Sequence, residues 1–202
     1  LMLTTNNLGF VAGSEEGAAA ARRATPPLKT IYFYLTEGCN LRCRHCWLEP
    51  PHQSAKRQYP ALEPGLFRHI LEQARPLGLS SVKLTGGEPL MHPQIGEILE
   101  ILRNEKLRFT VETNGVLCTP ELAQDLLRSG LYHISVSLDG ADADTHEWVR
   151  GVKGCFDAAV SGIFQFSLVN RHSLGRKLQG ELPLDPAADC QTVDLLQGHQ
   201  RL

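Results

Sequence analysis

The sequence lacks a surplus of charge of either sign. Its 20 lysines and arginines are balanced by 22 aspartates and glutamates, which leaves a net charge of −2. There is therefore no basic footprint for nucleic acid and no electrostatic anchor for an anionic membrane surface. No apolar run reaches the length of a transmembrane helix, and residues 1–5 lack the basic and apolar segments of a signal peptide. We expect a cytoplasmic protein that binds neither nucleic acid nor membrane.

The chain also lacks the regularly spaced cysteines of a disulfide framework. Three of its six cysteines share one short segment, residues 39–46, and the others are scattered without a pattern. This distribution fits a reducing compartment. With 202 residues, of which 42% are hydrophobic and 21% charged, the chain has the composition of an ordinary globular protein and the length for one domain with its own core.

The clustered cysteines carry the most information. Cys39, Cys43 and Cys46 form a C-x3-C-x2-C pattern directly after an apolar run at residues 31–35. Thiolates this close favour an iron–sulfur cluster, zinc or Cu(I). A four-iron cluster that only carries electrons takes four cysteines, so three would leave one iron open for another ligand. The spacing favours an iron–sulfur cluster. A structural zinc site, which usually needs a fourth Cys or His such as His45 or His52, and buried or disulfide-bonded thiols remain alternatives.

Strand and helix patterns alternate from residue 29 onward. The later strand patterns recur at the length of a compact βα unit, which predicts an α/β fold with a parallel sheet and outer helices. In such sheets the chemistry lies on loops beyond the carboxyl ends of the strands. Strands are expected at residues 30–35, 81–84, 107–112 and 132–138, and helices at 63–77, at 94–105 and from Pro120 to before Gly130.

Polar motifs follow three of these strands. Gly86-Gly87-Glu88-Pro89 follows the second strand, and its two glycines would let the backbone approach a ligand closely. The same four residues also suit a plain turn. Their predicted position at the cysteine end of the sheet favours ligand binding.

The third and fourth strands end in hydrogen-bonding groups. Thr113 and Asn114 suit ribose or carboxylate contacts, although Asn-Gly is also a common turn dipeptide. Ser137 and Asp139 end the fourth strand. The segment that follows, residues 144–151, predicts either a solvated polar helix or a site where Arg150 clamps a carboxylate.

Taken in order, these motifs resemble those of radical S-adenosylmethionine enzymes. The cysteine motif, the GGEP turn, Glu112-Thr113-Asn114-Gly115, Ser137-Leu138-Asp139-Gly140 and Arg150-Gly151 carry the resemblance, which covers roughly residues 29–165. The chain looks most like the peptide- and protein-modifying branch that usually carries a SPASM or twitch domain. The residues around the cysteines resemble those of maturases encoded in peptide natural-product cassettes, of the SynChlorMet type.

The resemblance implies a cofactor set and a reaction. Cys39, Cys43 and Cys46 would hold a 4Fe–4S cluster whose open iron takes the amino and carboxylate groups of S-adenosylmethionine. An electron from a donor such as flavodoxin or ferredoxin would then release a 5′-deoxyadenosyl radical that abstracts hydrogen from a peptide or protein substrate.

The resemblance also assigns the other residues. Gly86, Gly87 and Glu88 would receive the amino end of the methionine moiety. Thr113, Asn114 and Ser137 would contact ribose or carboxylate, Arg150 would contact the carboxylate, and His45 stands where the family usually has an aromatic residue against the adenine. The resemblance thus implies three cluster ligands, Cys39, Cys43 and Cys46, and eight cofactor contacts, which are His45, Gly86, Gly87, Glu88, Thr113, Asn114, Ser137 and Arg150.

The same comparison predicts a partial (βα) barrel that is incomplete. Residues 1–28 are expected to be a flexible leader, 29–166 the barrel core and 167–202 an irregular tail. Two further βα units and a cysteine-rich auxiliary domain would normally follow, so we expect a truncated enzyme with impaired substrate turnover. A zinc-binding structural module and an inactive remnant are the alternatives.

Overall fold

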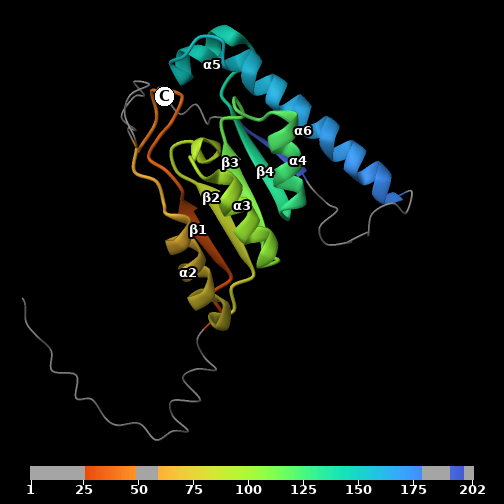
Figure 1. Ribbon diagram of the computed structural model, residues 1–202. Helices are drawn as coiled ribbons and strands as arrows, with labels where there is room; N and C mark the ends of the chain where they lie inside the picture. Colours follow the sequence, from red (N-terminus) through yellow and green to blue (C-terminus); the bar gives the residue numbers. More distant parts are fainter. Residues whose placement is uncertain (1–25, 49–58, 179–191, 198–202) are drawn as a thin grey trace, which may run out of the picture.

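The computed structural model describes residues 26–48, 59–178 and 192–197, which form one parallel sheet with helices against it (Figure 1). The sheet order is β1-β2-β3-β4-β5, so neighbours in the sequence are neighbours in space. Each adjacent pair of strands is parallel, which places all carboxyl ends at one edge. The strands are β1 (Thr30–Tyr34), β2 (Ser81–Thr85), β3 (Arg108–Thr113), β4 (Leu131–Leu138) and β5 (Thr192–Gln197).

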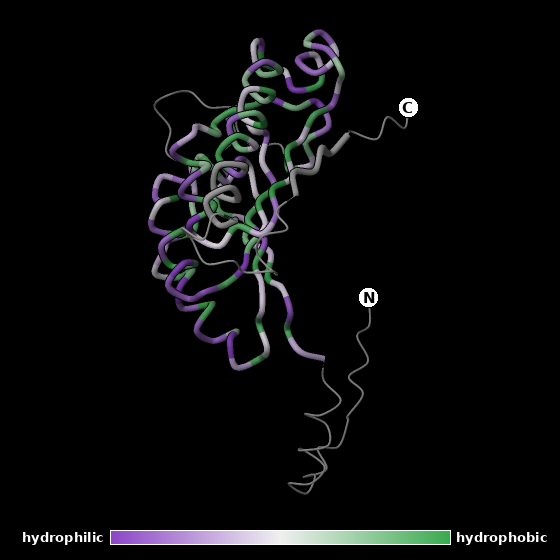
Figure 2. The backbone as a smooth tube through the Cα atoms, turned by 90° about the vertical axis from the view of Figure 1, so that its right-hand side faces the viewer, coloured by the Kyte–Doolittle hydropathy of each residue, from purple (hydrophilic) through white to green (hydrophobic). Residues whose placement is uncertain are grey.

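Helices connect the strands and lie on one side of the sheet, as the side view in Figure 2 shows. Two short 3-10 turns, η1 (Arg75–Leu77) and η2 (Pro89–Met91), extend these connections. The α-helices are α2 (Pro64–Ala74), α3 (Ile95–Asn104), α4 (Pro120–Arg128), α5 (Ala143–Arg150) and α6 (Cys155–Leu178).

Local sequence signals explain where two of these helices begin and end. The Thr119 hydroxyl accepts a hydrogen bond from the Leu122 N–H at 3.2 Å, and Pro120 occupies the first helical position of α4, as predicted. Asp142 caps α5 in the same way, accepting from Thr145 N at 2.8 Å. Gly151 ends α5 with a left-handed φ of 72°, which glycine adopts without steric cost.

The side chains of the strands alternate between two very different faces. Val82, Leu84, Phe109, Val111 and Ile134 point toward the helices and are at most 1% exposed. The residues between them, such as Lys83 and Thr110, point to the opposite face because successive strand residues alternate. The hydrophobic core therefore lies between the sheet and its helices.

The structure confirms the α/β fold and the four predicted strands, and it corrects the predicted tail. Residues 167–178 continue α6, and residues 192–197 form β5, which pairs in parallel with β4. Ile163, Phe166 and Val169 pack on the core at helical spacing across the boundary expected at residue 166. The sequence of residues 192–197 shows little apolar periodicity, which is why the strand was missed.

The predicted flexible leader falls almost entirely outside the described residues, as do His52 and Cys190. In the described part of the chain, no single helix is both long and apolar enough to cross a membrane. One bent pair, residues 143–150 with 155–170 at 103°, meets that test only when its two helices are taken together.

Candidate active site

A cavity of about 240 Å³ opens at the carboxyl ends of the strands. All the residues that the motifs single out as cluster ligands or cofactor contacts line it, although they come from five separate segments. They are Cys39, Cys43, His45, Cys46, Gly86, Gly87, Glu88, Thr113, Asn114, Ser137 and Arg150. The parallel strand order brings these segments together, as the sequence predicted. Their binding roles remain predictions.

The three cysteines of this cavity are free thiols. Burial is the main reason that the pKa of Cys39 is raised to about 11. The Leu41 N–H, which donates to Cys39 Sγ, lowers it, whereas the charges of Glu88 and of the other two cysteines raise it. Burial also raises the pKa of Cys43, which the Arg150 guanidinium partly offsets. The Cys39 and Cys43 thiols are therefore protonated near neutral pH, and a metal centre that binds them as thiolates must displace these protons.

The donor set fits a 4Fe–4S cluster. Such a cluster brings its own sulfides, so its cysteine ligands need not converge on a single atom. Three free thiols from one loop face one cavity here, and the remaining cavity wall offers backbone and polar groups for a further ligand. Within the described ranges, no group of three or more His, Cys, Asp or Glu side chains is arranged to hold a single metal ion.

The glycines after β2 let two loops of the cavity wall touch. Gly86 has a φ of 126°, and a Cβ on Gly87 would lie 2.3 Å from the Gly38 carbonyl oxygen. Across this contact, Gly87 N donates to Thr36 O and Glu88 N donates to Gly38 O, each at 2.8 Å. A side chain at residue 87 would therefore push the glycine turn away from the cysteine loop.

Glu88 holds the next part of the wall in place. Its carboxylate is 1% exposed and accepts from Leu90 N at 3.1 Å, Thr113 Oγ1 at 2.7 Å and Asn114 N at 2.8 Å. Burial raises the pKa of Glu88, and these three hydrogen bonds offset part of that rise. Glu88 thus joins the loop after β2 to the loop after β3.

The Asn114 side chain extends the connection to the cysteine loop. Its Nδ2 donates to Asn40 Oδ1 at 2.6 Å, and its Oδ1 accepts from Val116 N at 3.0 Å. Sequence reasoning missed Asn40, because a polar residue between two cysteines gives no sign of a partner 74 residues away.

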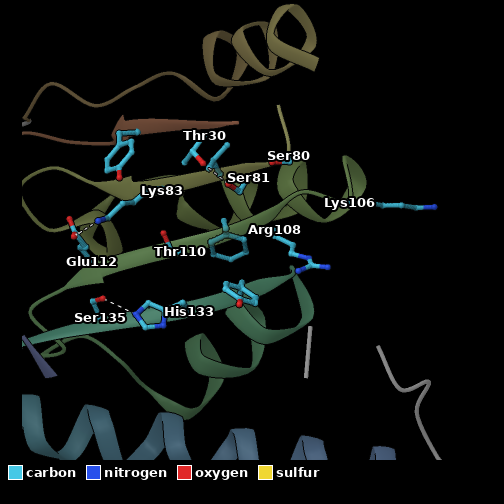
Figure 3. Close-up of a pocket in the computed structure, with 14 residues that line it drawn as sticks. Thr30, Ser80, Ser81, Lys83, Lys106, Arg108, Thr110, Glu112, His133 and Ser135 are labelled. Atoms are coloured by element: carbon cyan, nitrogen blue, oxygen red, sulfur yellow. Dashed lines mark hydrogen bonds and ion pairs between the residues drawn. The ribbon is translucent and has the colours of Figure 1, made fainter. Parts of the chain in front are cut away.

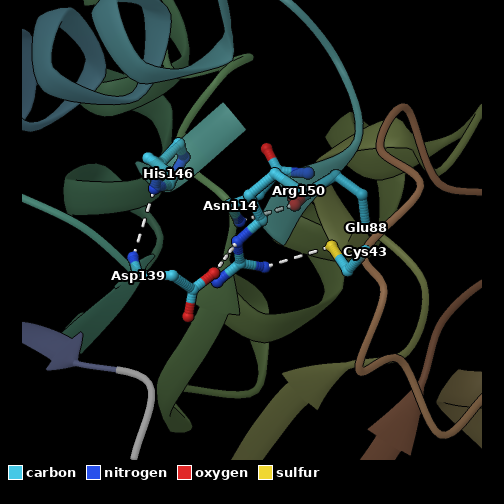
Figure 4. A network of polar contacts seen from close by, with 6 residues as sticks. All are labelled: Cys43, Glu88, Asn114, Asp139, His146 and Arg150. Atoms are coloured by element: carbon cyan, nitrogen blue, oxygen red, sulfur yellow. Dashed lines mark hydrogen bonds and ion pairs between the residues drawn. The ribbon is translucent and has the colours of Figure 1, made fainter. Parts of the chain in front are cut away.

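Arg150 lines the same cavity from the end of α5, and Figure 4 shows its contacts. Its Nη1 donates to Cys43 Sγ at 3.4 Å, and its Nε pairs with the Asp139 carboxylate. Asp139 N in turn donates to His146 Nδ1 at 3.1 Å. Sequence reasoning gave His146 no role. Its position four residues before the buried Arg150, hence on the same face of α5, is a signal that could have found it.

A larger trough of about 790 Å³ lies on the open face of the sheet (Figure 3). Alternate residues of β1 to β4 line it, and most of them are polar. Lys83 pairs with Glu112, whose carboxylate also accepts from Thr85 Oγ1 at 3.1 Å. Because Glu112 lines both hollows, the trough adjoins the cysteine cavity. Thr85 ends β2 directly before the GGEP turn, and Glu112 is the first residue of the motif Glu112-Thr113-Asn114-Gly115, which is the signal for them that the sequence contained.

Comparison with known proteins connects this geometry to a family. The model of the radical SAM superfamily matches residues 33–167. The AdoMet-dependent heme synthase of Methanosarcina barkeri is 36% identical over 137 residues, covering 67% of this chain and 38% of the relative. The mycofactocin maturase MftC of Mycolicibacterium smegmatis is 34% identical over 137 residues, covering 68% of this chain and 34% of the relative.

Solved structures agree with the sequence relatives. SuiB of Streptococcus suis bound to S-adenosylmethionine superposes with a TM-score of 0.58 at 26% identity, covering 71% of this chain and 32% of SuiB. The chain thus spans well under half the length of each of these relatives. A family match over most of the described fold, three free cysteines at the carboxyl ends of a parallel sheet and enzyme relatives lead to one conclusion: the chain belongs to the radical SAM superfamily of enzymes.

Proposed function

We propose that this chain forms the cofactor-binding core of an iron–sulfur enzyme that modifies a peptide or protein by radical chemistry. The observation that supports the proposal best is the shared cavity of the three free cysteines, the Gly86–Gly87 turn and Arg150. We also propose that the enzyme acts in the cytoplasm, and that its electrons come from a flavodoxin or ferredoxin.

Each group of residues has a proposed task. Cys39, Cys43 and Cys46 would hold the 4Fe–4S cluster, which when bound and reduced supplies the electron that cleaves S-adenosylmethionine to methionine and a 5′-deoxyadenosyl radical. The exposed backbone of the glycine turn and the Arg150 guanidinium would bind opposite charges at the two ends of the methionine moiety. The planar ring of His45 would lie against the adenine.

The trough beside the cavity is where the substrate would lie. Its hydroxyl groups, lysines and the Lys83–Glu112 pair suit a polar chain such as a peptide. The relationship to MftC, a maturase, supports this substrate class, and SuiB has also been solved bound to the precursor peptide SuiA. The heme synthase relatives make a macrocycle substrate the second candidate.

Anaerobic reconstitution with iron and sulfide tests the cofactor proposal. We expect visible cluster absorption, iron and sulfide bound to the chain, and 5′-deoxyadenosine release when a strong reductant and S-adenosylmethionine are added. Cys43→Ala should lose all three signals. Zinc bound in preference to a cluster would support the structural module, and a cluster that never cleaves the cofactor would support an inactive remnant.

The substrate proposal has its own test. Reconstituted protein is incubated with candidate precursor peptides or with iron coproporphyrin, and the products are examined by mass spectrometry. A mass change on a peptide that requires S-adenosylmethionine supports the first candidate. A change on the macrocycle alone supports the second.

A further inference from the structure

A chain of buried polar contacts leads from α5 to one of the cysteines. His146 is 0% exposed, the Asp139 side chain 5% and the Arg150 side chain 10%. The contacts run from His146 Nδ1 to Asp139 N, from the Asp139 carboxylate to Arg150 Nε, and from Arg150 Nη1 to Cys43 Sγ. Figure 4 shows these contacts as a continuous path from His146 through Asp139 and Arg150 to Cys43.

The backbone around Arg150 is fixed to the cysteine loop independently of this chain of contacts. Arg42 N donates to Arg150 O, and Arg44 N donates to Val149 O, each at 2.9 Å. A Cβ on Gly151 would lie 2.5 Å from the Arg42 carbonyl oxygen, so the close approach requires glycine. The remaining freedom of Arg150 is therefore in its long side chain, whose direction Asp139 determines.

We propose that Asp139 and His146 are positioning residues, which hold the Arg150 guanidinium against the Cys43 sulfur and thereby adjust the reduction potential of the cluster. The inference rests on the proposed function, because it assumes a cluster bound to Cys43. Asp139 aims Arg150 through the ion pair, and His146 fixes the backbone of Asp139. His146 accepts from Asp139 N, and the Asp139 carboxylate pairs with Arg150 Nε, so both residues act on Cys43 through Arg150.

The contact of Arg150 with Cys43 should shift the reduction potential of the cluster in one direction, which can be measured. An N–H···S bond and a positive charge both stabilise the reduced, more negative cluster, so they raise its reduction potential. Burial lowers the pKa of His146, which keeps the ring neutral and its Nδ1 able to accept from Asp139. If Arg150 turned away from Cys43, the cluster would become harder to reduce.

The test is a potentiometric titration of the reconstituted full chain without S-adenosylmethionine, followed by visible absorption and electron paramagnetic resonance. For Arg150→Met we expect the ratio of reduced to oxidised cluster at a fixed potential to fall about tenfold, which is about 59 mV for a one-electron couple. An assembled cluster with the wild-type potential in Arg150→Met would overturn the inference alone. A wild-type chain that binds no cluster would overturn the proposed function and the inference with it.

Two variants of Asp139 separate positioning from charge. Asp139→Ala and Asp139→Asn both remove the negative charge, but only asparagine keeps an oxygen that Arg150 Nε can donate to. We expect the potential of Asp139→Ala to lie below that of Asp139→Asn, and the two to become equal when each is combined with Arg150→Met. Equal potentials in the presence of Arg150 would show that Asp139 acts through its charge alone and would overturn its positioning role.

A pair of His146 variants tests positioning at the end of the chain of contacts that is farthest from Cys43. His146→Asn keeps an acceptor near the Nδ1 position, whereas His146→Phe keeps a ring without one. We expect a lower potential for His146→Phe than for His146→Asn, measured on the cluster that each protein retains. This pair also decides the case if Asp139→Ala fails to hold iron. Equal potentials for the two would overturn the role of His146.

Discussion

The helix-covered face of the sheet and the rim at its carboxyl ends are buried to a similar degree but contain opposite chemistry. Phe109 and Val111 on the covered face are fully buried among other hydrocarbon side chains. On the rim, Glu88 is 1% exposed and accepts three hydrogen bonds, and Arg150 is 8% exposed, donates to Cys43 Sγ and pairs with Asp139.

This difference separates stability from function. Burying hydrocarbon stabilises the fold in proportion to the apolar area removed from water. Burying a charge costs solvation free energy, and the attraction of a buried ion pair often does no more than offset that cost. A buried network of charges is therefore weak evidence for stability. We therefore infer that the covered face maintains the fold and that the rim is retained for what it binds.

The largest expected effect compares one cysteine from each region. Cys43 lies on the rim, and Cys118 is buried in the core cluster of the covered face. Cys43→Ala should abolish cluster retention, because all three thiols are needed, whereas Cys118→Ala should keep the cluster. Bound iron and visible absorption after anaerobic reconstitution measure both. Equal loss in the two variants would replace the three-cysteine site with a four-cysteine site.

A second pair of variants tests the covered face itself. Phe109→Ala should lower the free energy of unfolding by about 3–5 kcal/mol, because it leaves a cavity in a tightly packed core. Its neighbour Thr110 points to the open face, and Thr110→Ala should change the free energy of unfolding by no more than about 0.5 kcal/mol. Urea titration of both proteins measures the difference, and similar values would contradict the assignment of the two faces.

Glu88→Gln should change both the stability of the fold and the binding of the cofactor, so one variant tests both properties. Two of the three donors to Glu88 meet one carboxylate oxygen, and Asn114 N meets the other. A glutamine places an NH2 group at one of these positions, so a buried donor loses its acceptor, at a cost of about 1–3 kcal/mol.

The same variant should also bind S-adenosylmethionine more weakly, because the loops after β2 and β3 lose their connection. Glu100→Gln on the exposed surface of α3 is the matched control, and it should change the free energy of unfolding by less than about 0.5 kcal/mol. Urea titration and equilibrium binding to reconstituted protein give the two readouts. Unchanged binding with reduced stability would limit Glu88 to a structural role.

The smallest effect concerns pH. Burial, followed by the charge of Arg150, lowers the pKa of His146 from its ordinary value of 6.5. Above that value the ring is neutral in both states. Below it the unfolded chain binds a proton that the folded chain does not, so stability falls by at most about 1.4 kcal/mol per pH unit until the folded-state pKa is reached.

The measurement for His146 is the pH dependence of the free energy of unfolding, for the wild type and for His146→Asn. The slope below pH 6.5 should be smaller in the variant. Identical slopes would mean that His146 is no more difficult to protonate in the folded protein than in the unfolded chain.

Local patterns in the sequence were sufficient for most of the fold. Alternating apolar residues predicted β3 and β4, and Thr119-Pro120 predicted the start of α4. The predicted irregular tail was wrong for residues 167–178, which continue α6, and for residues 192–197, which form β5 and are recognisable as a strand only from their pairing with β4.

The candidate site was predictable as a set of residues but not as a set of contacts. Motifs and their order at the ends of strands were enough to bring Cys43, Glu88 and Arg150 to one cavity. The partners of these residues were not predictable. Arg150 and Cys43 are 107 residues apart, and the donors to Glu88 from the β3 loop are about one βα unit away. Contacts of that kind depend on the packed fold and have no local signature.

The separation of Arg150 from Cys43 has a consequence for biosynthesis. The ribosome makes the cysteine loop 107 residues before it makes Arg150. Synthesis proceeds at about 5–20 residues per second, so about 5–20 s pass between the synthesis of the three cysteines and that of Arg150, which completes the lining of their cavity. During that time the nascent chain holds reactive thiols without a closed pocket around them. For the proposed cluster, delivery of iron and sulfide into the finished pocket would therefore follow the emergence of α5, and the thiols would need protection from oxidation until then.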